Sequence, residues 1–256
     1  MSHLQNDPKV AAIILAAGKG TRLKAKDKNK VVFEIGDKPM VVHTVNNLLA
    51  AKIDQLIAVV GFKAETVRAA LGSKVDYAIQ DPPQGTGDAA KIGAAKLNHD
   101  IEVVLIVSGD DSAFYSPDLY RRMVAKLHQE QADIVLLTLV KDNPTGLGRI
   151  IRDHHGHIEK IVEEKVATEA EKAIKEINTS MYCVKRDFLL QALPEIKRNP
   201  VSKEFYLTDI VEIANRHHRR VLPLLLDDER YWHGVNTRED WQQAQLKYQL
   251  LKQTQS

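Results

Sequence analysis

Small residues and basic residues are concentrated in one segment near the start of this 256-residue chain, Leu15–Arg22. Glycines and other small residues let a backbone approach an anion and present N–H groups to it. The spacing is not that of a P-loop, and Leu23 is too large for the third small residue of a dinucleotide fingerprint. Further bases follow at Lys24, Lys26, Lys28 and Lys30. The segment therefore predicts a phosphate-binding loop of another type.

A second segment with the composition of a ligand-binding turn contains Gln80 and Gly85-Thr86-Gly87. The Gly-Thr-Gly sequence leads into a predicted helix and favours a tight backbone turn. The amide of Gln80 offers one acceptor and two donors, which match the N–H and C=O groups on the edge of a pyrimidine. Taken alone, this segment is a weak signal, and an ordinary loop is the alternative interpretation.

Acidic residues end a third apolar run, in Ser108-Gly109-Asp110-Asp111. A carboxylate at the carboxyl end of a central strand is a usual ligand of Mg²⁺ in phosphoryl-transfer sites, because this hard cation prefers oxygen donors. A helix cap or a loop charge is the alternative for Asp110. For Asp111, a solvated loop acid or helix cap is the favoured interpretation, with a metal ligand as the alternative.

Four apolar runs are suited to position these segments, namely Val10–Ala16, Leu56–Val60, Val103–Val107 and Ile134–Val140. Such runs predict strands that are covered on both faces of a largely parallel sheet. Helical patterns fit between them at Met40–Lys52, Ala64–Leu71, Gly87–Leu97 and Pro117–Glu130. The alternation predicts an α/β fold with a doubly wound, mostly parallel, Rossmann-like sheet, in which ligands bind at the carboxyl ends of the strands.

The second half of the chain is less regular. Arg149–Arg152 and Ile158–Val162 predict a hairpin around a turn with three histidines. We expect that turn to be solvated, because no fourth ligand stands at a spacing diagnostic of a metal site. Glu169–Glu176 is predicted as a charged helix, and residues 237–253 as a C-terminal helix with a capping-box-like start. We expect one domain over residues 1–256.

Composition and charge exclude several classes of protein. Hydrophobic residues make up 44 % of the chain, which supports a sizeable core, and the net charge of +2 leaves no global basic field for a long nucleic acid. The single cysteine, Cys183, excludes an internal disulfide and a multi-cysteine zinc site. No signal-peptide core or bilayer-length apolar run is present. We therefore expect a soluble, cytoplasmic protein without nucleic-acid or membrane partners.

The ordered set of motifs resembles the sugar-1-phosphate nucleotidyltransferase family, and most of all the uridylyltransferase domain of the bacterial bifunctional enzyme that makes UDP-N-acetylglucosamine. The motifs that carry the resemblance are Leu15–Arg22, Gln80, Gly85–Gly87, Gly109-Asp110, Gly148-Arg149, Ile161–Glu163, Glu176–Thr179, Tyr206–Ile210 and Gly234–Asn236. Many motifs in one order are far more specific than any single one. The acetyltransferase domain of that enzyme has no counterpart here, so no acetyl-CoA activity is expected.

The resemblance implies a role for each motif residue. The nucleotide would be held by Leu15, Ala16, Ala17, Gly18, Gly20, Thr21, Gln80, Gly85 and Thr86. The sugar 1-phosphate would be held by Gly109, Gly148, Glu163 and Asn178. Arg22, Lys30 and Asp110 would be catalytic, and Asp110 and Asn236 would hold Mg²⁺. The implied fold is of the nucleotide-diphospho-sugar transferase type, with a nucleotide-binding part at about 8–115, a sugar-binding part with the hairpin at about 116–236, and a C-terminal helix at about 237–253.

The implied reaction joins UTP and a sugar 1-phosphate, by in-line attack on the α-phosphorus, to give a UDP-sugar and pyrophosphate. N-acetylglucosamine 1-phosphate is the leading substrate. The chain has Asn29, Asp88, Ser108 and Ser180 where the family usually has proline, histidine, tyrosine and glycine. Several of these positions face the sugar in the family, so the sugar stays open. The alternatives are a cytidylyl- or thymidylyltransferase for another phosphorylated sugar or polyol, and a non-catalytic nucleotide-binding regulator. A homo-oligomer is compatible with each of them.

Overall fold

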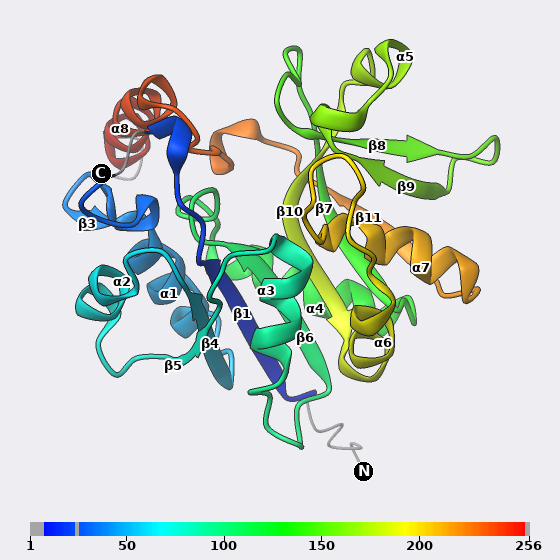
Figure 1. The fold of residues 1–256 in the computed structure, drawn as a ribbon, viewed down its shortest axis with the longest axis horizontal. Helices are drawn as coiled ribbons and strands as arrows, with labels where there is room; N and C mark the ends of the chain where they lie inside the picture. Colours follow the sequence, from blue (N-terminus) through cyan, green and yellow to red (C-terminus); the bar gives the residue numbers. More distant parts are fainter. Residues whose placement is uncertain (1–7, 24–25, 254–256) are drawn as a thin grey trace.

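One mixed sheet lies between two layers of helices in the computed structural model, which describes residues 8–23 and 26–253 (Figure 1). Lys24 of the basic segment lies outside these residues. The strands are β1 (Val10–Ala16), β2 (Glu34–Ile35), β3 (Lys38–Pro39), β4 (Gln55–Val60), β5 (Asp76–Ile79), β6 (Val103–Ser108), β7 (Ile134–Val140), β8 (Gly148–Arg152), β9 (Ile158–Val162), β10 (Glu176–Lys185) and β11 (Val221–Leu225). The helices are α1 (Met40–Ala50), α2 (Ala64–Leu71), α3 (Thr86–Ala94), α4 (Pro117–Gln129), α5 (Glu169–Lys172), α6 (Arg186–Ala192), α7 (Ile210–Arg216) and α8 (Arg238–Gln253).

The order of the main sheet is β11-β7-β10-β6-β1-β4-β5. β1 pairs in parallel with β4 and β6, β4 with β5, and β7 with β11, whereas β10 runs antiparallel to both β6 and β7. The predicted α/β fold with a mostly parallel sheet is therefore confirmed. The hairpin of β8 and β9 is attached to β10 and projects beside the sheet (Figure 1).

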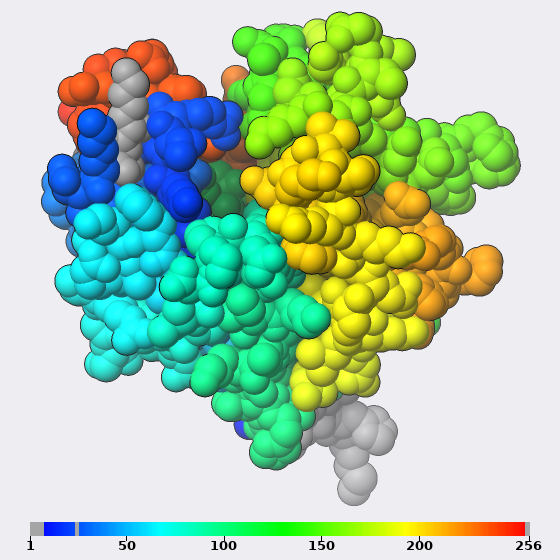
Figure 2. All heavy atoms as spheres, in the orientation of Figure 1, coloured from blue at the N-terminus to red at the C-terminus, as the bar shows by residue number. Residues whose placement is uncertain are grey.

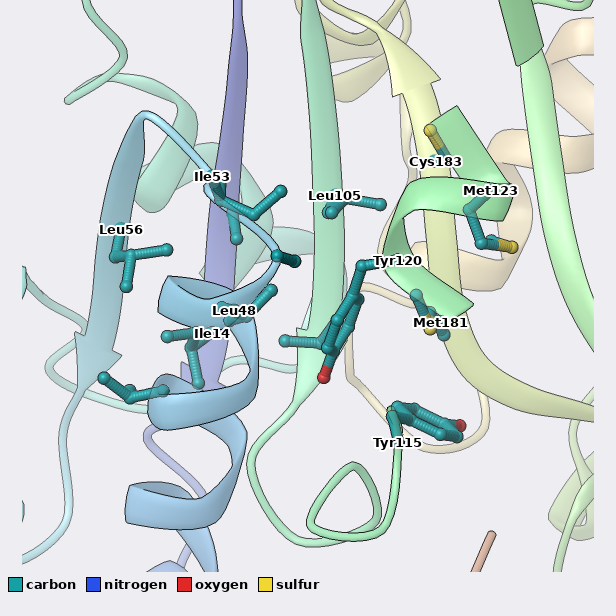
Figure 3. Packing of buried hydrophobic residues seen from close by; sticks show 14 of the residues in the cluster. Ile14, Leu48, Ile53, Leu56, Leu105, Tyr115, Tyr120, Met123, Met181 and Cys183 are labelled. Atoms are coloured by element: carbon teal, nitrogen blue, oxygen red, sulfur yellow. The ribbon is translucent and has the colours of Figure 1, made fainter. Parts of the chain in front are cut away.

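Both faces of the sheet are buried, as the continuous apolar runs predict. Along β1, Ala12 and Ile14 pack in one cluster with α1, α2 and α4, while Ile13 and Leu15 pack in the other with α3, α6 and α7. Figure 3 shows part of the first cluster, in which Leu48 of α1 approaches the strands. Each fully buried aliphatic side chain contributes about 1.5–3 kcal/mol to stability. This double coverage fixes the strand ends that form the site.

Helix ends follow the predicted capping residues where side chains can reach them. Ser116 accepts a hydrogen bond from the backbone N–H of Leu119 at the start of α4. At the start of α8, Thr237 and Asp240 cap each other's backbone N–H groups, at 3.1 and 2.7 Å. The predicted charged helix Glu169–Glu176 is only partly correct: α5 ends at Lys172 and β10 begins at Glu176. The helical charge pattern there continues into a strand because pairing with β7 and β8 overrides local propensity.

A third apolar cluster joins the two ends of the chain. Trp241 of α8 packs edge-on against Phe33 at 6.3 Å between ring centroids, and its Nε1 donates to the carbonyl of Glu34 at 2.7 Å. α8 therefore lies against β2 and the turn after it, and holds the segment before it next to the glycine-rich loop. Among the described residues, no helix combines the length and the hydrophobicity that a membrane crossing needs.

The histidine-containing turn of the hairpin is exposed. The backbone N–H groups of His155 and His157 donate to Asp153, which closes the turn. In the described part of the chain, no three His, Cys, Asp or Glu side chains gather in a way that could hold a metal ion.

Candidate active site

The carboxyl ends of the parallel strands open into a cleft of about 660 Å³, lined by Leu15–Arg22, Lys30, Gln80, Gly85, Thr86 and Asp110 among others. Figure 2 shows the surface hollowed here, between the blue segment near the N-terminus and the yellow segment near residue 205. A smaller pocket of about 190 Å³ is lined by Asp110, Gly148, Glu163, Asn178 and Asn236, among others. Arg22, Asp110 and Glu163 line both, so the residues predicted for the nucleotide and for the sugar meet in one continuous site.

The glycine-rich loop is held in place by a buried residue, Asn29, for which no role was predicted. Asn29 is fully buried, and its Nδ2 donates to the carbonyls of Ala16 at 3.0 Å and Phe62 at 2.7 Å. Its Oδ1 accepts from the backbone N–H of Val31 at 3.1 Å. The only signal in the sequence was an asparagine where the family usually has proline. Asn29 thus ties the end of β1 to the turn that carries Lys30.

Gly20 allows Lys30 to approach this loop. It has a φ of +58°, and a Cβ built on it would lie 2.8 Å from the Cβ of Lys30. A larger residue would therefore strain the backbone and displace the lysine.

The second loop presents Gln80 to the cleft with its amide group already oriented. Gln80 is 2 % exposed, and its Nε2 donates to the carbonyl of Gly85 at 3.0 Å and to Oδ2 of Asp88 at 2.7 Å. Of the one acceptor and two donors that the sequence suggested for a base, both donors are used within the protein. The hydroxyl of Thr86 accepts from the backbone N–H of Leu207 at 3.0 Å, which fastens this loop to the far wall of the cleft.

Charged groups converge where the two pockets meet. Asp110 follows β6 and forms an ion pair with Lys30, while its Oδ1 accepts from the hydroxyl of Ser108 at 2.7 Å. Burial acts to raise the pKa of the Asp110 carboxyl, but the Lys30 ammonium and the hydrogen bond from Ser108 outweigh it and hold the pKa below its usual value. Asp110 is therefore an anion at neutral pH.

Asp111 differs from its neighbour and from the favoured interpretation. It is buried, and its Oδ1 has no hydrogen-bond partner among the residues that the structure describes. Burial, with the charge of Asp110 as the second cause, raises the pKa of the Asp111 carboxyl well above its usual value. The expectation of a solvated loop acid is wrong, because the turn after β6 folds inward, beneath the smaller pocket that Asp111 lines.

Asp110 and Asn236 lie together although 126 positions separate them in the sequence. The backbone N–H of Val235 donates to the carbonyl of Asp110 at 3.0 Å, and both side chains line the smaller pocket. A carboxylate and an amide oxygen are hard donors that suit Mg²⁺. In this structure cationic side chains contact the same oxygens: Lys30 pairs with Asp110, and Arg22 donates to Oδ1 of Asn236 at 2.8 Å. The donor set thus fits a divalent cation and already attracts positive charge.

The sugar side of the site is shaped by an irregularity in β10. The register of β10 against β7 shifts between Asn178 and Tyr182, and Ser180 in this interval has a φ of +59°. A bulge of this kind redirects side chains, and Asn178 and Ser180 both line the smaller pocket. The Nδ2 of Asn178 donates to the hydroxyl of Tyr182 at 2.7 Å, which fixes its orientation.

The remaining predicted sugar residues fall into two groups. Gly148 and Glu163 line the smaller pocket, and burial is the main cause that raises the pKa of Glu163. Gly109 lines neither pocket. Its N–H donates to the carbonyl of Leu15 at 3.0 Å, and an added Cβ would lie 3.2 Å from that oxygen, so Gly109 permits close packing of the strand ends.

Arg149 has a structural role that its sequence motif did not reveal. It is 1 % exposed, pairs with Glu164 at 2.6 Å and donates to the carbonyl of Lys172 at 3.4 Å. These contacts hold the segment after Glu163 against β8. Only the folded hairpin brings these residues together.

Known proteins share this architecture and sequence. A family profile described as "Nucleotidyl transferase" matches residues 11–250. "Bifunctional protein GlmU" of Geobacillus sp. (strain WCH70) is 45 % identical over 79 % of this chain and 44 % of its own length. The protein of the same name from Limosilactobacillus reuteri is 40 % identical over 89 % of this chain and 50 % of its own length, so the chain spans about half of these relatives.

A solved structure also has the same fold. It comes from Bacillus anthracis, is provisionally described as a glucose-1-phosphate thymidylyltransferase, and matches with a TM-score of 0.77 and 22 % identity over 93 % of this chain and 94 % of that one. The family profile that matches residues 11–250 confirms the predicted enzyme family: the chain belongs to the nucleotidyl transferases.

Proposed function

We propose that this protein is a sugar-1-phosphate uridylyltransferase that joins UTP and N-acetylglucosamine 1-phosphate to give UDP-N-acetylglucosamine and pyrophosphate. The observation that carries the proposal is the continuity of the two pockets. The glycine-rich loop and Gln80 line one end, Glu163 and Asn178 line the other, and Arg22 and Asp110 stand between them. A triphosphate and a sugar phosphate bound in this order would have their phosphates at the shared residues.

The chemistry of the residues on each side of the cleft indicates which substrate each side would hold. Residues at about 8–115 would hold the nucleotide, with backbone N–H groups of the glycine-rich loop facing its phosphates. Residues at about 116–236 would hold the sugar, because the side chains of Glu163 and Asn178 can bind hydroxyl groups. The segment at about 237–253 would support the loop that carries Asn236.

The reaction needs no protein nucleophile, because the phosphate oxygen of the sugar 1-phosphate is already ionised. That oxygen attacks the α-phosphorus of UTP, the bond to the β-phosphate breaks, and pyrophosphate leaves with its electron pair. Positioning and charge neutralisation then supply the rate enhancement. Arg22 and Lys30, which both line the cleft, would stabilise the departing pyrophosphate.

Asp110 and Asn236 would hold a Mg²⁺ ion, which supplies charge neutralisation on the phosphates of both substrates. Lys30 and Arg22 would then exchange their present contacts with these two residues for contacts with phosphate. The protein's own contribution is a set of cations and anions that can re-pair as the substrates bind.

The test is a pyrophosphate-release screen of UTP, CTP, dTTP, ATP and GTP against a panel of sugar 1-phosphates. We expect UTP with N-acetylglucosamine 1-phosphate to give the highest kcat/KM. CTP or dTTP as the best nucleotide would favour the alternative of a cytidylyl- or thymidylyltransferase. No release with any pair would favour a non-catalytic nucleotide-binding regulator.

A matched pair of variants tests the sugar side. Glu163→Gln should raise the KM for the sugar phosphate while the KM for UTP stays nearly unchanged, because Glu163 lines the sugar pocket. Glu159→Gln removes an exposed carboxylate from the same hairpin and should change neither value. Equal effects of the two variants on the sugar KM would remove Glu163 from the site.

A further inference from the structure

Gln80 presents a hydrogen-bond acceptor, and not a donor, to the cleft. Its Nε2 carries two protons, and these are directed at the carbonyl of Gly85 and at Oδ2 of Asp88. Within the described ranges no residue donates to its Oε1, and Gln80 lines the cleft.

Asp88 favours this orientation of the Gln80 carboxamide over the opposite one. Rotation of the carboxamide by half a turn would place Oε1 against both the Asp88 carboxylate at 2.7 Å and the Gly85 carbonyl at 3.0 Å, which are acceptors only. Acceptors that face one another at these distances repel, and a hydrogen bond to a charged carboxylate is about twice as strong as a neutral one. Gln80 in this chain therefore lacks the freedom of an ordinary glutamine to present either end.

The position of Asp88 makes it a feature of this loop and not of the sheet behind it. Asp88 lies in the first turn of α3, next to Gly85, whose φ is +112° and whose added Cβ would lie 2.5 Å from the carbonyl of Phe205. Two backbone hydrogen bonds hold the loop against that wall: the N–H of Phe205 donates to the carbonyl of Gln84, and the N–H of Gly87 donates to the carbonyl of Phe205, both at 2.8 Å. Asp88 stands where the family usually has histidine, so this acceptor is not one of the family's motif residues.

We propose that Asp88 fixes Gln80 as an obligate acceptor and thereby makes the cleft select uracil and thymine over cytosine. The inference rests on the proposed function, in which the base lies beside Gln80. Uracil and thymine carry an N–H donor at N3, whereas N3 of cytosine is an acceptor. A base with an acceptor at this point leaves two acceptors face to face, which costs more binding than the loss of one contact. Asp88 is thus a positioning residue that acts through Gln80.

The test compares binding and turnover of UTP and CTP by the full chain and by two variants. Asp88→Ala removes the charged acceptor and leaves only the neutral Gly85 carbonyl to disfavour the rotated carboxamide, so we expect the UTP-to-CTP ratio of kcat/KM to fall by about tenfold. Asp88→Glu keeps an acceptor-only carboxylate at this position, with one more methylene of reach toward Nε2. It should retain the ratio within about threefold. A fall of similar size in both variants would mean that Asp88 does not act as an acceptor for Gln80.

A third nucleotide examines the N3 donor directly. Calorimetric binding of N3-methyluridine 5′-triphosphate, which lacks that donor, should be at least about tenfold weaker than binding of UTP to the unaltered protein. The ratio of the two affinities should shrink in Asp88→Ala.

Three results would overturn the inference, and one of them would also overturn the proposed function. An unaltered UTP-to-CTP ratio in Asp88→Ala, alongside a collapsed ratio in Gln80→Ala, would leave base selection with Gln80 and exclude Asp88. Equal binding of UTP and CTP by the unaltered protein would contradict any selection at N3. Failure of the protein to bind any of the three nucleotides would overturn the proposed function, and the inference with it.

Discussion

Lys30 and Arg22 bring like charges into the cleft, but they hold different partners. Lys30 is paired with the buried Asp110, with side-chain exposures of 18 % and 11 %, whereas Arg22 is exposed and contacts Asn236. Removing one member of a buried pair leaves a charge without compensation, but removing an exposed partner costs little. The two residues should therefore separate when stability and activity are measured on the same variants.

We predict that Lys30→Ala and Arg22→Ala each lower turnover at least about tenfold, because both cations face the phosphates of the proposed substrates. Only Lys30→Ala should also lower the free energy of unfolding, by about 2–3 kcal/mol. Steady-state kinetics and urea unfolding on the same samples measure both effects. Lys26→Ala removes an exposed base of the same loop and is the control. Retained turnover in both variants would show that these residues have no part in the reaction.

Asp209 introduces a pH dependence outside the phosphate-binding residues. It stands at the start of α7, where burial, assisted by the charge of Glu212, raises its pKa from 3.8 to about 6. The folded protein thus binds this proton more tightly than the unfolded chain. The stability that comes from this group is present below about pH 4 and is lost as the pH rises through about 6.

We predict that Asp209→Asn raises the free energy of unfolding by about 1–2 kcal/mol at pH 8 and changes it little at pH 4, a range that allows for the partial exposure of the group. Unfolding curves at the two pH values measure the difference. Glu212→Gln should reproduce a smaller part of the gain, because it removes only the neighbouring charge. The same gain at both pH values would contradict a titration of Asp209.

At the scale of elements, the glycine-rich loop depends on one side chain from the next turn. We predict that Asn29→Ala lowers the free energy of unfolding by about 2–4 kcal/mol, because it leaves the buried carbonyls of Ala16 and Phe62 without their donor. The KM for the triphosphate should rise as the loop loses its fixed geometry. Asn46→Ala on α1 removes a half-buried amide with no hydrogen bond to the described residues and is the control. Equal stability of the two variants would exclude the proposed support of the loop.

The sequence predicted the central strands β1, β4, β6 and β7, the hairpin, and most of the longer helices, because their signals are local, but it predicted neither β11 nor the helices α6 and α7. A continuous run such as Val10–Ala16 can only be buried on both faces, and Ser116 can cap only the helix that follows it. The short α5 and the shift of register in β10 were not predicted, because pairing with distant strands determines both. The burial of Asp111 and the contacts of Asn29 were not predicted for the same reason, because each depends on residues far away in the chain.

At the scale of the whole molecule, the order of the sheet is what assembles the site. β1 lies between β4 and β6, so the loops after these three strands open at one edge, and the hairpin on β10 adds the opposite wall. α8 then returns the chain to the glycine-rich loop and brings Asn236 within 2.8 Å of Arg22, across 214 positions. The motif order predicted a set of site residues, but only the folded structure shows that Lys30 and Arg22 contact the side-chain oxygens of Asp110 and Asn236.

We predict that Asp110→Asn lowers turnover at least about 10²-fold, because it keeps the shape of the side chain but removes the charge that holds a divalent cation. Asn236→Ala should cause a loss of similar order. If both act through one ion, the double variant should be little worse than either single variant, because the second change has no bound ion left to lose. The concentration of Mg²⁺ for half-maximal rate should rise in each single variant, and EDTA should abolish the reaction.

Asp142→Asn, on an exposed loop, is the control. Losses that add in full would mean that the two residues act separately. An inactive Asp111→Asn beside an active Asp110→Asn would move the ligand to Asp111, the buried carboxyl whose Oδ1 has no partner within the described part of the chain.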